Sequence, residues 1–502
     1  MAAAERLRKA ATRSASSGED KAATLGEHGV LIAGKWLKTG DAIEVHSPYD
    51  DSLVAVVHRA GAKEIESAIN GAVVAFDATR RMPVWRRAEI LESISAGIAR
   101  DREAFARIIA LEAGKPIRTA RAEVDRAVFT FKIAAEETKR IYGEIIPMDW
   151  LPGTEGRVGQ VWRVPLGPVV GIAPFNFPLN LVAHKVAPAL AAGNPILLRP
   201  SSQTPVSALK LAEVLLEAGW PAEAIAVLPC STEAATPLVE DDRTKMLTFT
   251  GSPAVGWALK RRAGRKKVTL ELGGNAGVIV NDDADLAYAA ERVAWGGYSY
   301  AGQSCISVQR VYIHSDVYES FVDDLIPRVE ALKLGDPLAE ATDVGPVIDS
   351  GAAVRVESWV REARSAGAEI LAGGERDGNL IQPTVLASIR ADMRVSCQEV
   401  FGPVVGLYRF NDVMQAIRDV NDGEFGLQAG LFTNDWRVVQ SAFDEIEVGG
   451  LMVNDVPTFR VDHMPYGGVK MSGMGREGLR YAIEEMTEMK LMMINRRDDK
   501  AG

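Results

Sequence analysis

The sequence predicts an α/β fold built from two units, each with a parallel sheet packed against helices. Between residues 166 and 274, short apolar runs alternate with Ala- and Leu-rich stretches at helical spacing. The runs are bounded by Gly and Pro, which is typical of buried parallel strands joined by crossover helices. The same alternation resumes at Asp285 and continues to about residue 470. These two regions indicate separate sheets.

The elements of the first unit can be assigned in chain order. Amphipathic spacing predicts helices over residues 62–80, 84–113 and 117–141, which would pack on the sheet. Strands are expected at Val169–Ala173, Ile196–Leu198, Ala224–Leu228, Met246–Phe249 and Val268–Leu270, with helices at Leu179–Ala192 and Val206–Ala218. Strands alternating with helices in this way are typical of dinucleotide-binding architectures.

Composition narrows the class of protein. A chain of 502 residues suggests more than one core, and 47% apolar with 25% charged residues is an ordinary globular balance. The net charge of −10 argues against nucleic acid or an anionic membrane as the main partner. No apolar run is long enough to predict a membrane helix.

Cysteine and histidine usage suggests a compartment and argues against a metal. Three cysteines cannot build a disulfide framework, so a reducing, cytoplasmic compartment is expected. The six histidines show no metal-binding spacing, and no catalytic metal is expected. Residues 1–25 are rich in Ala, Arg, Lys and Ser; Glu5 and the lack of a clear cleavage pattern favour a flexible N-terminal extension over a transit peptide.

Two short segments carry the strongest chemical signal: Glu271-Leu272-Gly273-Gly274 and Gly302-Gln303-Ser304-Cys305. A thiol attacks an electrophile as thiolate, and a nearby carboxylate can act as the base that activates a thiol or a water. A single Cys is more often a packing residue, so the pair needs context before it indicates catalysis.

That context comes from five segments: residues 173–178, 249–256, 271–275, 302–305 and 399–403. Taken together and in order, these segments resemble the aldehyde dehydrogenase superfamily, and the resemblance extends from about residue 28 to about residue 495. The resemblance implies two Rossmann-like α/β domains plus a small β oligomerisation element, and a homodimer or homotetramer. It assigns residues 26–143 and 167–273 to NAD(P) binding, 274–472 to catalysis, and 144–166 with 473–502 to oligomerisation, through a protruding hairpin near 144–166 that is joined by a C-terminal strand near 487–496.

The resemblance also implies a reaction in two halves. Cys305 would add to an aldehyde, with the Asn176 amide and its own backbone N–H holding the oxyanion. After hydride transfer to the nicotinamide, Glu271 would activate the water that hydrolyses the thioester. Glu271 lies where the strand at 268–270 ends, the edge at which such sheets bind ligands. Lys185 matches a position near the active site and ranks below these three.

Cofactor residues follow from the same match. Ser252 fits a helix N-cap and Pro253 the first helical turn, and a helix N-terminus suits a pyrophosphate. The positions carried over as cofactor contacts are Phe175, Arg199, Ser202, Gly251, Ser252, Gly256, Leu272, Glu399 and Phe401. The cofactor is NAD or NADP. Arg199 stands where the family usually has Lys, and Ser202 removes a common Glu, which favours acceptance of NADP.

The substrate is less constrained by the sequence. Candidate contacts are Arg126, Phe177, Ser304, Ile306, Arg460 and His463. Arg126 either contacts an anionic substrate or is a solvated residue on a helix face. Ser304 stands where relatives acting on phosphorylated substrates often carry Arg, which weakens a phosphate interpretation. The segment after Cys305 looks like the branch with lactaldehyde, succinic semialdehyde and non-phosphorylating glyceraldehyde-3-phosphate dehydrogenases, so a small polar or anionic aldehyde is expected.

Two alternatives stay open at this point. One is a semialdehyde dehydrogenase that transfers the acyl group to coenzyme A, although the presence of Glu271 favours a free acid product. The other is a non-catalytic structural protein, which the joint presence of Cys305, Glu271 and Asn176 disfavours. Cys230 and Cys397 lie in no motif, and packing roles are expected for both.

Overall fold

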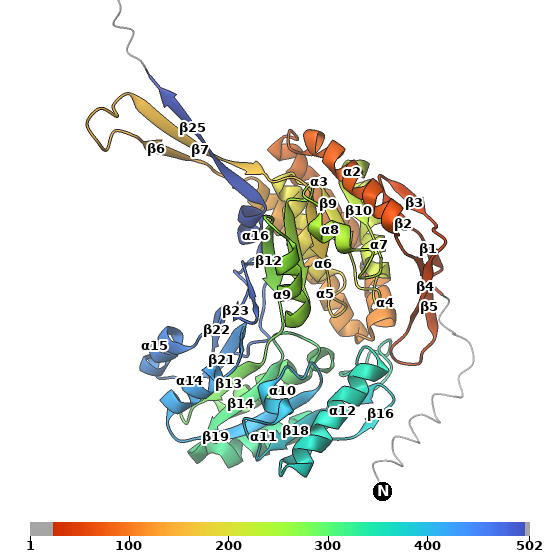
Figure 1. Ribbon diagram of the computed structural model, residues 1–502. Helices are drawn as coiled ribbons and strands as arrows, with labels where there is room; N and C mark the ends of the chain where they lie inside the picture. Colours follow the sequence, from red (N-terminus) through yellow and green to blue (C-terminus); the bar gives the residue numbers. More distant parts are fainter. Residues whose placement is uncertain (1–23, 497–502) are drawn as a thin grey trace, which may run out of the picture.

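The computed structural model describes residues 24–496, and its two large sheets confirm the α/β fold (Figure 1). Except for its last two residues, the extension expected over residues 1–25 lies outside the described part of the chain, as do residues 497–502. Each large sheet contributes to its own main cluster of buried apolar side chains. The chain therefore folds around at least two cores, as its length suggests.

The first sheet has eight strands in the order β24-β12-β11-β8-β9-β10-β2-β3. Its five central strands are parallel and match the predicted ones to within a residue or two, whereas β24, β2 and β3 pair antiparallel. The strands are β2 (Val30–Ile32), β3 (Lys35–Leu37), β8 (Val169–Ile172), β9 (Ile196–Arg199), β10 (Ile225–Val227), β11 (Met246–Thr250), β12 (Lys267–Glu271) and β24 (Gly473–Met474).

One predicted helix of the first unit differs from the observed structure. The helix expected over residues 84–113 is divided at Asp101, whose backbone (φ −96°, ψ 20°) ends one helix and begins the next. The helices are α2 (Ala62–Thr79), α3 (Val84–Arg100), α4 (Arg102–Ala113), α5 (Ile117–Thr138), α6 (Asn180–Ala192), α7 (Val206–Glu217), η1 (Ala222–Ala224), α8 (Thr236–Glu240), α9 (Pro253–Arg262) and α16 (Leu479–Glu485).

The second sheet has seven strands in the order β15-β18-β19-β14-β13-β21-β22. All its pairings are parallel except that of β15, at one edge. The strands are β13 (Ala276–Val280), β14 (Val308–His314), β15 (Glu369–Ala372), β18 (Thr384–Ala387), β19 (Val404–Phe410), β21 (Gln428–Phe432) and β22 (Gly450–Val453). The helices are α10 (Leu286–Tyr298), η2 (Ser299–Gly302), η3 (Ser315–Val317), α11 (Tyr318–Glu330), α12 (Ser350–Ser365), α13 (Arg394–Cys397), α14 (Val413–Asn421) and α15 (Trp436–Glu445).

Smaller sheets are attached to these two units. They comprise β1 (Glu27–His28), β4 (Ala42–His46) and β5 (Leu53–His58) in one sheet, and the pairs β16 (Arg376–Asp377) with β17 (Leu380–Ile381) and β20 (Phe425–Gly426) with β23 (Val469–Lys470). Within residues 24–496, no helix is both long and apolar enough to cross a membrane.

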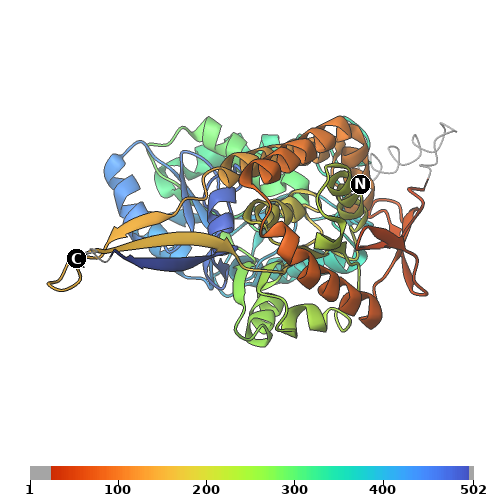
Figure 2. The same cartoon turned by 90° about the horizontal axis from the view of Figure 1, so that it is seen from above.

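A three-stranded sheet projects from the body, with the order β25-β7-β6 (Figures 1 and 2). It is formed by β6 (Glu144–Pro147), β7 (Arg157–Pro165) and β25 (Thr487–Asn495). The segment expected to join this sheet at 473–502 divides differently, because Gly473 and Met474 pair with β12 and α16 packs against α6. Of the described residues beyond 473, β25 forms the projecting part, at the position expected for the C-terminal strand that joins the hairpin.

Candidate active site

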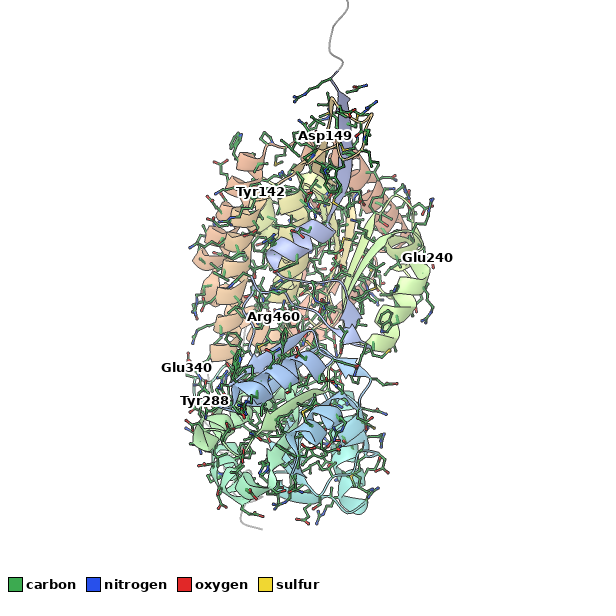
Figure 3. The ribbon with its side chains drawn as sticks, turned by 90° about the vertical axis from the view of Figure 1, so that its left-hand side faces the viewer. Tyr142, Asp149, Glu240, Tyr288, Glu340 and Arg460 are labelled. Atoms are coloured by element: carbon green, nitrogen blue, oxygen red, sulfur yellow. The ribbon has the colours of Figure 1, made fainter. Side chains whose placement is uncertain are left out.

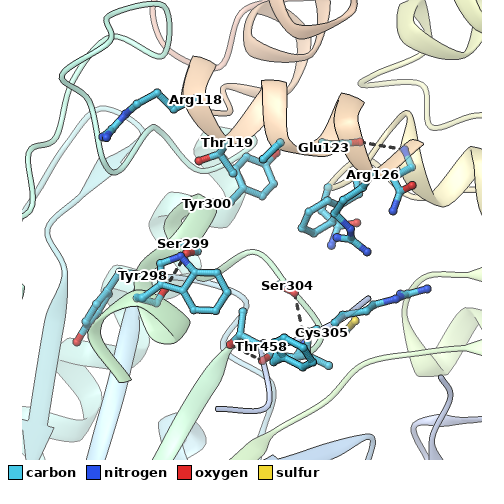
Figure 4. A pocket seen from close by; sticks show the side chains of 18 of the residues that line it. Arg118, Thr119, Glu123, Arg126, Tyr298, Ser299, Tyr300, Ser304, Cys305 and Thr458 are labelled. Carbon is cyan, nitrogen blue, oxygen red and sulfur yellow. Dashed lines mark hydrogen bonds between the residues drawn. The ribbon is translucent and has the colours of Figure 1, made fainter. Parts of the chain in front are cut away.

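A cavity of about 480 Å³ lies where α5 faces the loop that carries Cys305 (Figure 4). In Figure 4, Glu123 and Arg126 project from α5 on one side, and Cys305 and Thr458 lie on the other. Most of the predicted substrate and catalytic residues line this cavity: Arg126, Asn176, Phe177, Ser304, Cys305, Ile306 and Arg460. Segments as far apart in sequence as Arg126 and Arg460 therefore meet at one site, as the motifs predict.

The loop before Cys305 has an unusual backbone. Tyr300, Ala301 and Gly302 all have positive φ, at 50°, 52° and 68°. A Cβ at Gly302 would lie 2.1 Å from the carbonyl oxygen of Gly402, so only glycine fits there. Such conformations cost about 1–3 kcal/mol for each non-glycine residue and persist only where the surroundings impose them. The loop thus turns sharply to present the thiol to the cavity.

The Cys305 side chain is partly exposed and has one close polar neighbour. Its Sγ lies 3.0 Å from Oη of Tyr466. Burial raises the pKa of the thiol to about 12, and the hydrogen bond with Tyr466 opposes that rise. This thiol therefore needs help from its surroundings to ionise at neutral pH.

Asn176 follows β8 and reaches the nucleophile loop. Its Nδ2 donates to the carbonyl oxygen of Gln303 at 3.0 Å, and the second amide hydrogen stays available. The backbone N–H of Cys305 donates no hydrogen bond to any of residues 24–496. The Asn176 amide and this N–H are therefore available donors at the cavity that Cys305 lines.

Glu123 fixes the segment that carries Asn176. Its Oε1 accepts the backbone N–H groups of Leu179 and Asn180 at 3.0 and 3.1 Å, at the start of the fully buried helix α6. The other oxygen of Glu123 pairs with the buried Lys115, whose ammonium lies 3.7 Å from the Phe177 ring centroid. A carboxylate at a helix N-terminus is favourable for the helix dipole, so α5 holds α6 and the loop before it in place.

Glu271 ends β12 and is 3% exposed. Neither carboxylate oxygen has a hydrogen-bond partner within the described part of the chain. Burial and the neighbouring Glu477 raise its pKa well above the ordinary value, although Arg460 and Lys185 pull in the opposite direction. A buried carboxylate with free oxygens and a raised pKa can accept a proton from water near neutral pH.

A second buried carboxylate, Glu477, lies beside Glu271 and belongs to an ion-pair cluster. Its oxygens contact Lys185 Nζ at 3.4 Å and Arg460 Nη2 at 2.9 Å. Burial alone would raise the pKa of Glu477, but Lys185, His184 and Arg460 lower it to about 2. Glu477 stays ionised while Glu271 can hold a proton, so the two carboxylates differ in role.

Arg126 is held at the cavity wall by Asp462. Its Nη2 and Nε contact the Asp462 carboxylate at 2.6 and 3.1 Å. Asp462 also accepts from Asn180 Nδ2 at 3.1 Å and contacts His184 Nε2 at 2.8 Å. Arg126 is therefore an ordered residue of the cavity wall and not a freely solvated one.

Arg460 lies between the two units (Figure 3). Its guanidinium stacks 3.6 Å from the centroid of the Tyr466 ring, and its buried Nε has no hydrogen-bond partner among the described residues. His463, in contrast, is exposed, packs edge-on against Phe129 and does not line the cavity.

A second group of predicted residues is expected to bind the cofactor. Ser252 is the N-cap of α9 and Pro253 its first residue, as the sequence predicts, and Ser252 makes no side-chain capping bond. The first-turn N–H groups therefore stay available for a phosphate. Gly256 packs against Leu272, since a Cβ there would lie 2.4 Å from Leu272 Cδ2, and a larger residue would require that side chain to move.

Glu399, Phe175 and Phe401 are further residues predicted to contact the cofactor. Glu399 Oε1 accepts the backbone N–H of Gly274 at 2.9 Å, and burial raises its pKa to about 7. A Cβ at Gly273 would lie 2.4 Å from Glu399 Oε2, so glycine leaves room for the Glu399 carboxylate. Phe175 and Phe401 contact edge to face at 5.9 Å. These residues fit a nicotinamide dinucleotide.

The two residues expected at the adenosine ribose follow β9. Arg199 Nη2 donates to the Cys230 carbonyl oxygen at 3.2 Å, and Arg199 forms no ion pair with the described residues. Ser202 is exposed. The end of β9 thus offers a cation without a carboxylate partner.

A sequence model of the "Aldehyde dehydrogenase family" matches residues 36–492. The chain belongs to the aldehyde dehydrogenase family. It is an oxidoreductase that acts on the aldehyde group and uses a nicotinamide cofactor.

This aldehyde dehydrogenase is similar to three proteins with different named substrates or ligands. The chain is 46% identical over 470 residues to a 3-sulfolactaldehyde dehydrogenase of Priestia aryabhattai, covering 93% of this chain and 98% of that protein. The structure of aldehyde dehydrogenase 21 from Physcomitrella patens in complex with the reaction product succinate has 43% identity, a TM-score of 0.93, and coverage of 95% and 100%. Glyceraldehyde-3-phosphate dehydrogenase GapN from Methanocaldococcus jannaschii complexed with NADP has 38% identity, a TM-score of 0.87, and coverage of 91% and 99%.

Two residues at or near the cavity of this aldehyde dehydrogenase are marked by no motif: Tyr466, which contacts Cys305, and Glu477, which contacts Lys185. Asp462, which contacts Arg126, lies in the segment 459–463 expected at the mouth of the cavity. The glycine-rich stretch 467–478 was the available signal, because repeated glycines often mark close approach of the backbone to another group.

The two remaining cysteines differ from each other. Cys230 is buried, as the packing interpretation requires. Cys397 is exposed, so the packing role expected for it is wrong. It ends the short helix α13 (Arg394–Cys397), which lies at the surface and turns this side chain outward.

Proposed function

We propose that this aldehyde dehydrogenase oxidises a small anionic aldehyde to the free carboxylic acid. The observation that supports an anion is the charge around the cavity. Three arginines line it, Arg118, Arg126 and Arg460. The buried Nε of Arg460 has no hydrogen-bond partner among the described residues and offers a donor. A buried donor without a partner is costly unless a ligand satisfies it.

The names of similar proteins support the same substrate class. Sulfolactaldehyde, succinate and glyceraldehyde 3-phosphate, each named for one of the relatives, all carry an anionic group in addition to the aldehyde or acid carbon. Their anions differ in charge and shape. The common feature is an aldehyde with a negative group a few bonds from the reacting carbon.

The first half of the proposed reaction forms a bond to Cys305. The thiolate adds to the aldehyde carbon, and the carbonyl electron pair moves to oxygen. Asn176 Nδ2 and the backbone N–H of Cys305 hold that oxyanion; one such donor is typically worth about 3–4 kcal/mol. A bound nicotinamide would supply the hydride acceptor, and loss of hydride from the tetrahedral carbon would leave a thioester on Cys305.

The second half regenerates the thiol. Glu271 takes a proton from a water molecule as that water attacks the thioester, and the C–S bond breaks to release the acid. Glu271 suits this role because its oxygens have no other partner in the described structure. A placed base of this kind commonly contributes about 10²–10⁴-fold.

An aldehyde panel tests the proposed function. Succinic semialdehyde and butanal have the same chain length and differ in the carboxylate; each is assayed with and without coenzyme A, beside Cys305→Ser. We expect preference for succinic semialdehyde, indifference to coenzyme A and no turnover in the variant. Equal rates with butanal would contradict the anionic substrate, and turnover that requires coenzyme A would contradict the role of Glu271.

Replacing Arg126 with Gln is expected to weaken the preference for an anion. A charge-assisted hydrogen bond is worth about 1.5–3 kcal/mol, so KM for succinic semialdehyde should rise about 10- to 100-fold. The value of kcat/KM for butanal should change little. Steady-state kinetics of both substrates measure this. Arg102→Gln is the matched control, because Arg102, the first residue of α4, pairs with Asp125 of α5 in the same bidentate way. Equal losses for both aldehydes would show that Arg126 does not contact the anion.

We further propose that NADP is accepted. Arg199 lacks a carboxylate partner and Ser202 brings no negative charge to the ribose, which suits a 2′-phosphate.

The variant Ser202→Glu is expected to lower kcat/KM with NADP about 10- to 100-fold and to leave NAD less affected. A carboxylate repels the 2′-phosphate but accepts a hydrogen bond from the free 2′-hydroxyl. Initial rates with each cofactor measure the change. The same loss with both cofactors would refute the assignment of Ser202.

The projecting sheet supports a proposed homo-oligomer. Its strands and the intervening loop expose large apolar side chains: Ile145, Trp150, Leu151, Trp162, Met489, Leu491 and Met492. The outer edges of β6 and β25 have no strand partner within the described chain. Exposed apolar edge strands favour pairing with another chain.

A further inference from the structure

Tyr466 contacts the nucleophile directly, although the mechanism above does not use it. Its Oη lies 3.0 Å from Sγ of Cys305, and this is the one hydrogen bond that the hydroxyl makes among the described residues. The side chain is 3% exposed. A buried phenol normally has a partner, and here that partner is the reacting sulfur.

The backbone around Tyr466 fixes this contact. Its N–H donates to the carbonyl oxygen of Glu477 at 3.0 Å, and the N–H of Glu477 donates back at 2.6 Å. The next residue, Gly467, lies against the base, since a Cβ there would be 2.8 Å from Glu271 Oε1. One short bridge therefore places a phenol at the thiol and a glycine at the carboxylate.

The Tyr466 ring also carries a cation on its face. The guanidinium carbon of Arg460 lies 3.6 Å from the ring centroid. A cation over the ring is attracted to the π electrons and withdraws electron density from the phenol. This makes the O–H a stronger hydrogen-bond donor without removing its proton.

We propose that Tyr466 is a further catalytic residue, whose O–H donates a hydrogen bond to the Cys305 thiolate and so favours the ionised nucleophile. While the sulfur is a thiol, either atom can be the donor. Once the S–H proton has left for water, only the phenol carries a hydrogen, and a bond to a charged acceptor is stronger than a neutral one. Tyr466 keeps its proton throughout. The proposal rests on the role of Cys305 in the proposed function.

Other charges near Sγ explain why such help matters. Burial raises the pKa of Cys305 most, and the carboxylates of Glu399 and Glu271 raise it further. Arg460 and the Tyr466 hydrogen bond act in the opposite direction. The Tyr466 hydroxyl is the polar group in direct contact with sulfur. Removing that hydroxyl alone isolates its contribution to the pKa of Cys305, because the ring and Arg460 stay in place.

The variant Tyr466→Phe tests the proposal by alkylation of the cofactor-free enzyme with iodoacetamide. Peptide mass spectrometry follows Cys305 separately, and the exposed Cys397 serves as an internal reference. A hydrogen bond to a charged group corresponds to a pKa change of about 1–2 units. Because thiolates of higher pKa are also more nucleophilic, alkylation of Cys305 at neutral pH should slow about three- to ten-fold. The acid limb of the pH profile of kcat/KM should move to higher pH.

A second tyrosine provides the matched control. Tyr298 lines the same cavity and is equally buried, but its Oη donates to the carbonyl oxygen of Thr384 at 3.0 Å. Tyr298→Phe should leave the alkylation rate of Cys305 unchanged. An unchanged or faster rate in Tyr466→Phe, with Cys397 behaving as in the wild type, would overturn the proposal. Alkylation needs no aldehyde, so this result is independent of the aldehyde panel that tests the proposed function.

Discussion

Replacing Glu271 with Gln is expected to stop steady-state oxidation but to leave one equivalent of reduced nicotinamide per active site. Gln has the same shape and cannot take a proton from water, so the thioester on Cys305 should form and persist. Loss of a placed base should slow its hydrolysis about 10²–10⁴-fold. Stopped-flow absorbance of reduced nicotinamide measures the first turnover, and intact-protein mass spectrometry detects the acyl group on Cys305.

The pH dependence of the wild-type enzyme provides an independent check on Glu271. Burial and Glu477 raise its pKa, and only the deprotonated form is a base. The hydrolysis rate should therefore rise with pH through that raised pKa, and Glu271→Gln should lose this limb. Glu240→Gln, at an exposed carboxylate paired with Arg262, is the control. Absence of the first-turnover burst in Glu271→Gln would mean that Glu271 acts before the thioester forms.

Replacing Asn176 with Ala is expected to lower kcat/KM about 10²–10³-fold, because one oxyanion donor is worth about 3–4 kcal/mol. The loss should appear in the burst rate as well as in steady-state turnover, since the oxyanion forms before hydride transfer. Alkylation of Cys305 by iodoacetamide should stay near the wild-type rate, because that reaction forms no oxyanion.

A control for this variant comes from an amide outside the cavity. Asn281→Ala removes a buried side chain that donates to Asp283, and it should not affect the burst. If Asn176→Ala slowed alkylation as much as oxidation, Asn176 would be supporting the nucleophile loop through its bond to Gln303. That outcome would contradict its assignment as an oxyanion donor.

The sequence predicts best where the signal is local. The parallel strands from Val169 to Glu271 are short apolar runs between Gly and Pro, and each lies within a residue or two of its expected position. Ser252 and Pro253 likewise begin a helix, because capping preferences act within one turn. Asn176 and Cys305 meet in one cavity, as the combined motifs predict.

The parts that could not be predicted depend on contacts between distant segments. Tyr466 lies 161 positions from the thiol that it contacts, and Asp462 lies 336 positions from Arg126. No periodicity encodes such pairs. His463 was expected in the cavity, but its neighbour Asp462 points inward and leaves His463 at the surface. The break at Asp101 was missed because both adjoining helices continue the same amphipathic pattern.

The left-handed turn at Tyr300–Gly302 has a consequence for how the enzyme loses activity. This turn is held by outside contacts, including the bond from Tyr300 Oη to the Ala113 carbonyl oxygen and the bond from the Ile348 N–H to Gln303 Oε1. Backbone kept in a costly conformation relaxes when its supports loosen, and local opening requires less free energy than global unfolding. Mild heat or denaturant should therefore inactivate the protein before its sheets unfold, and useful lifetime will depend on the anchors of one short turn.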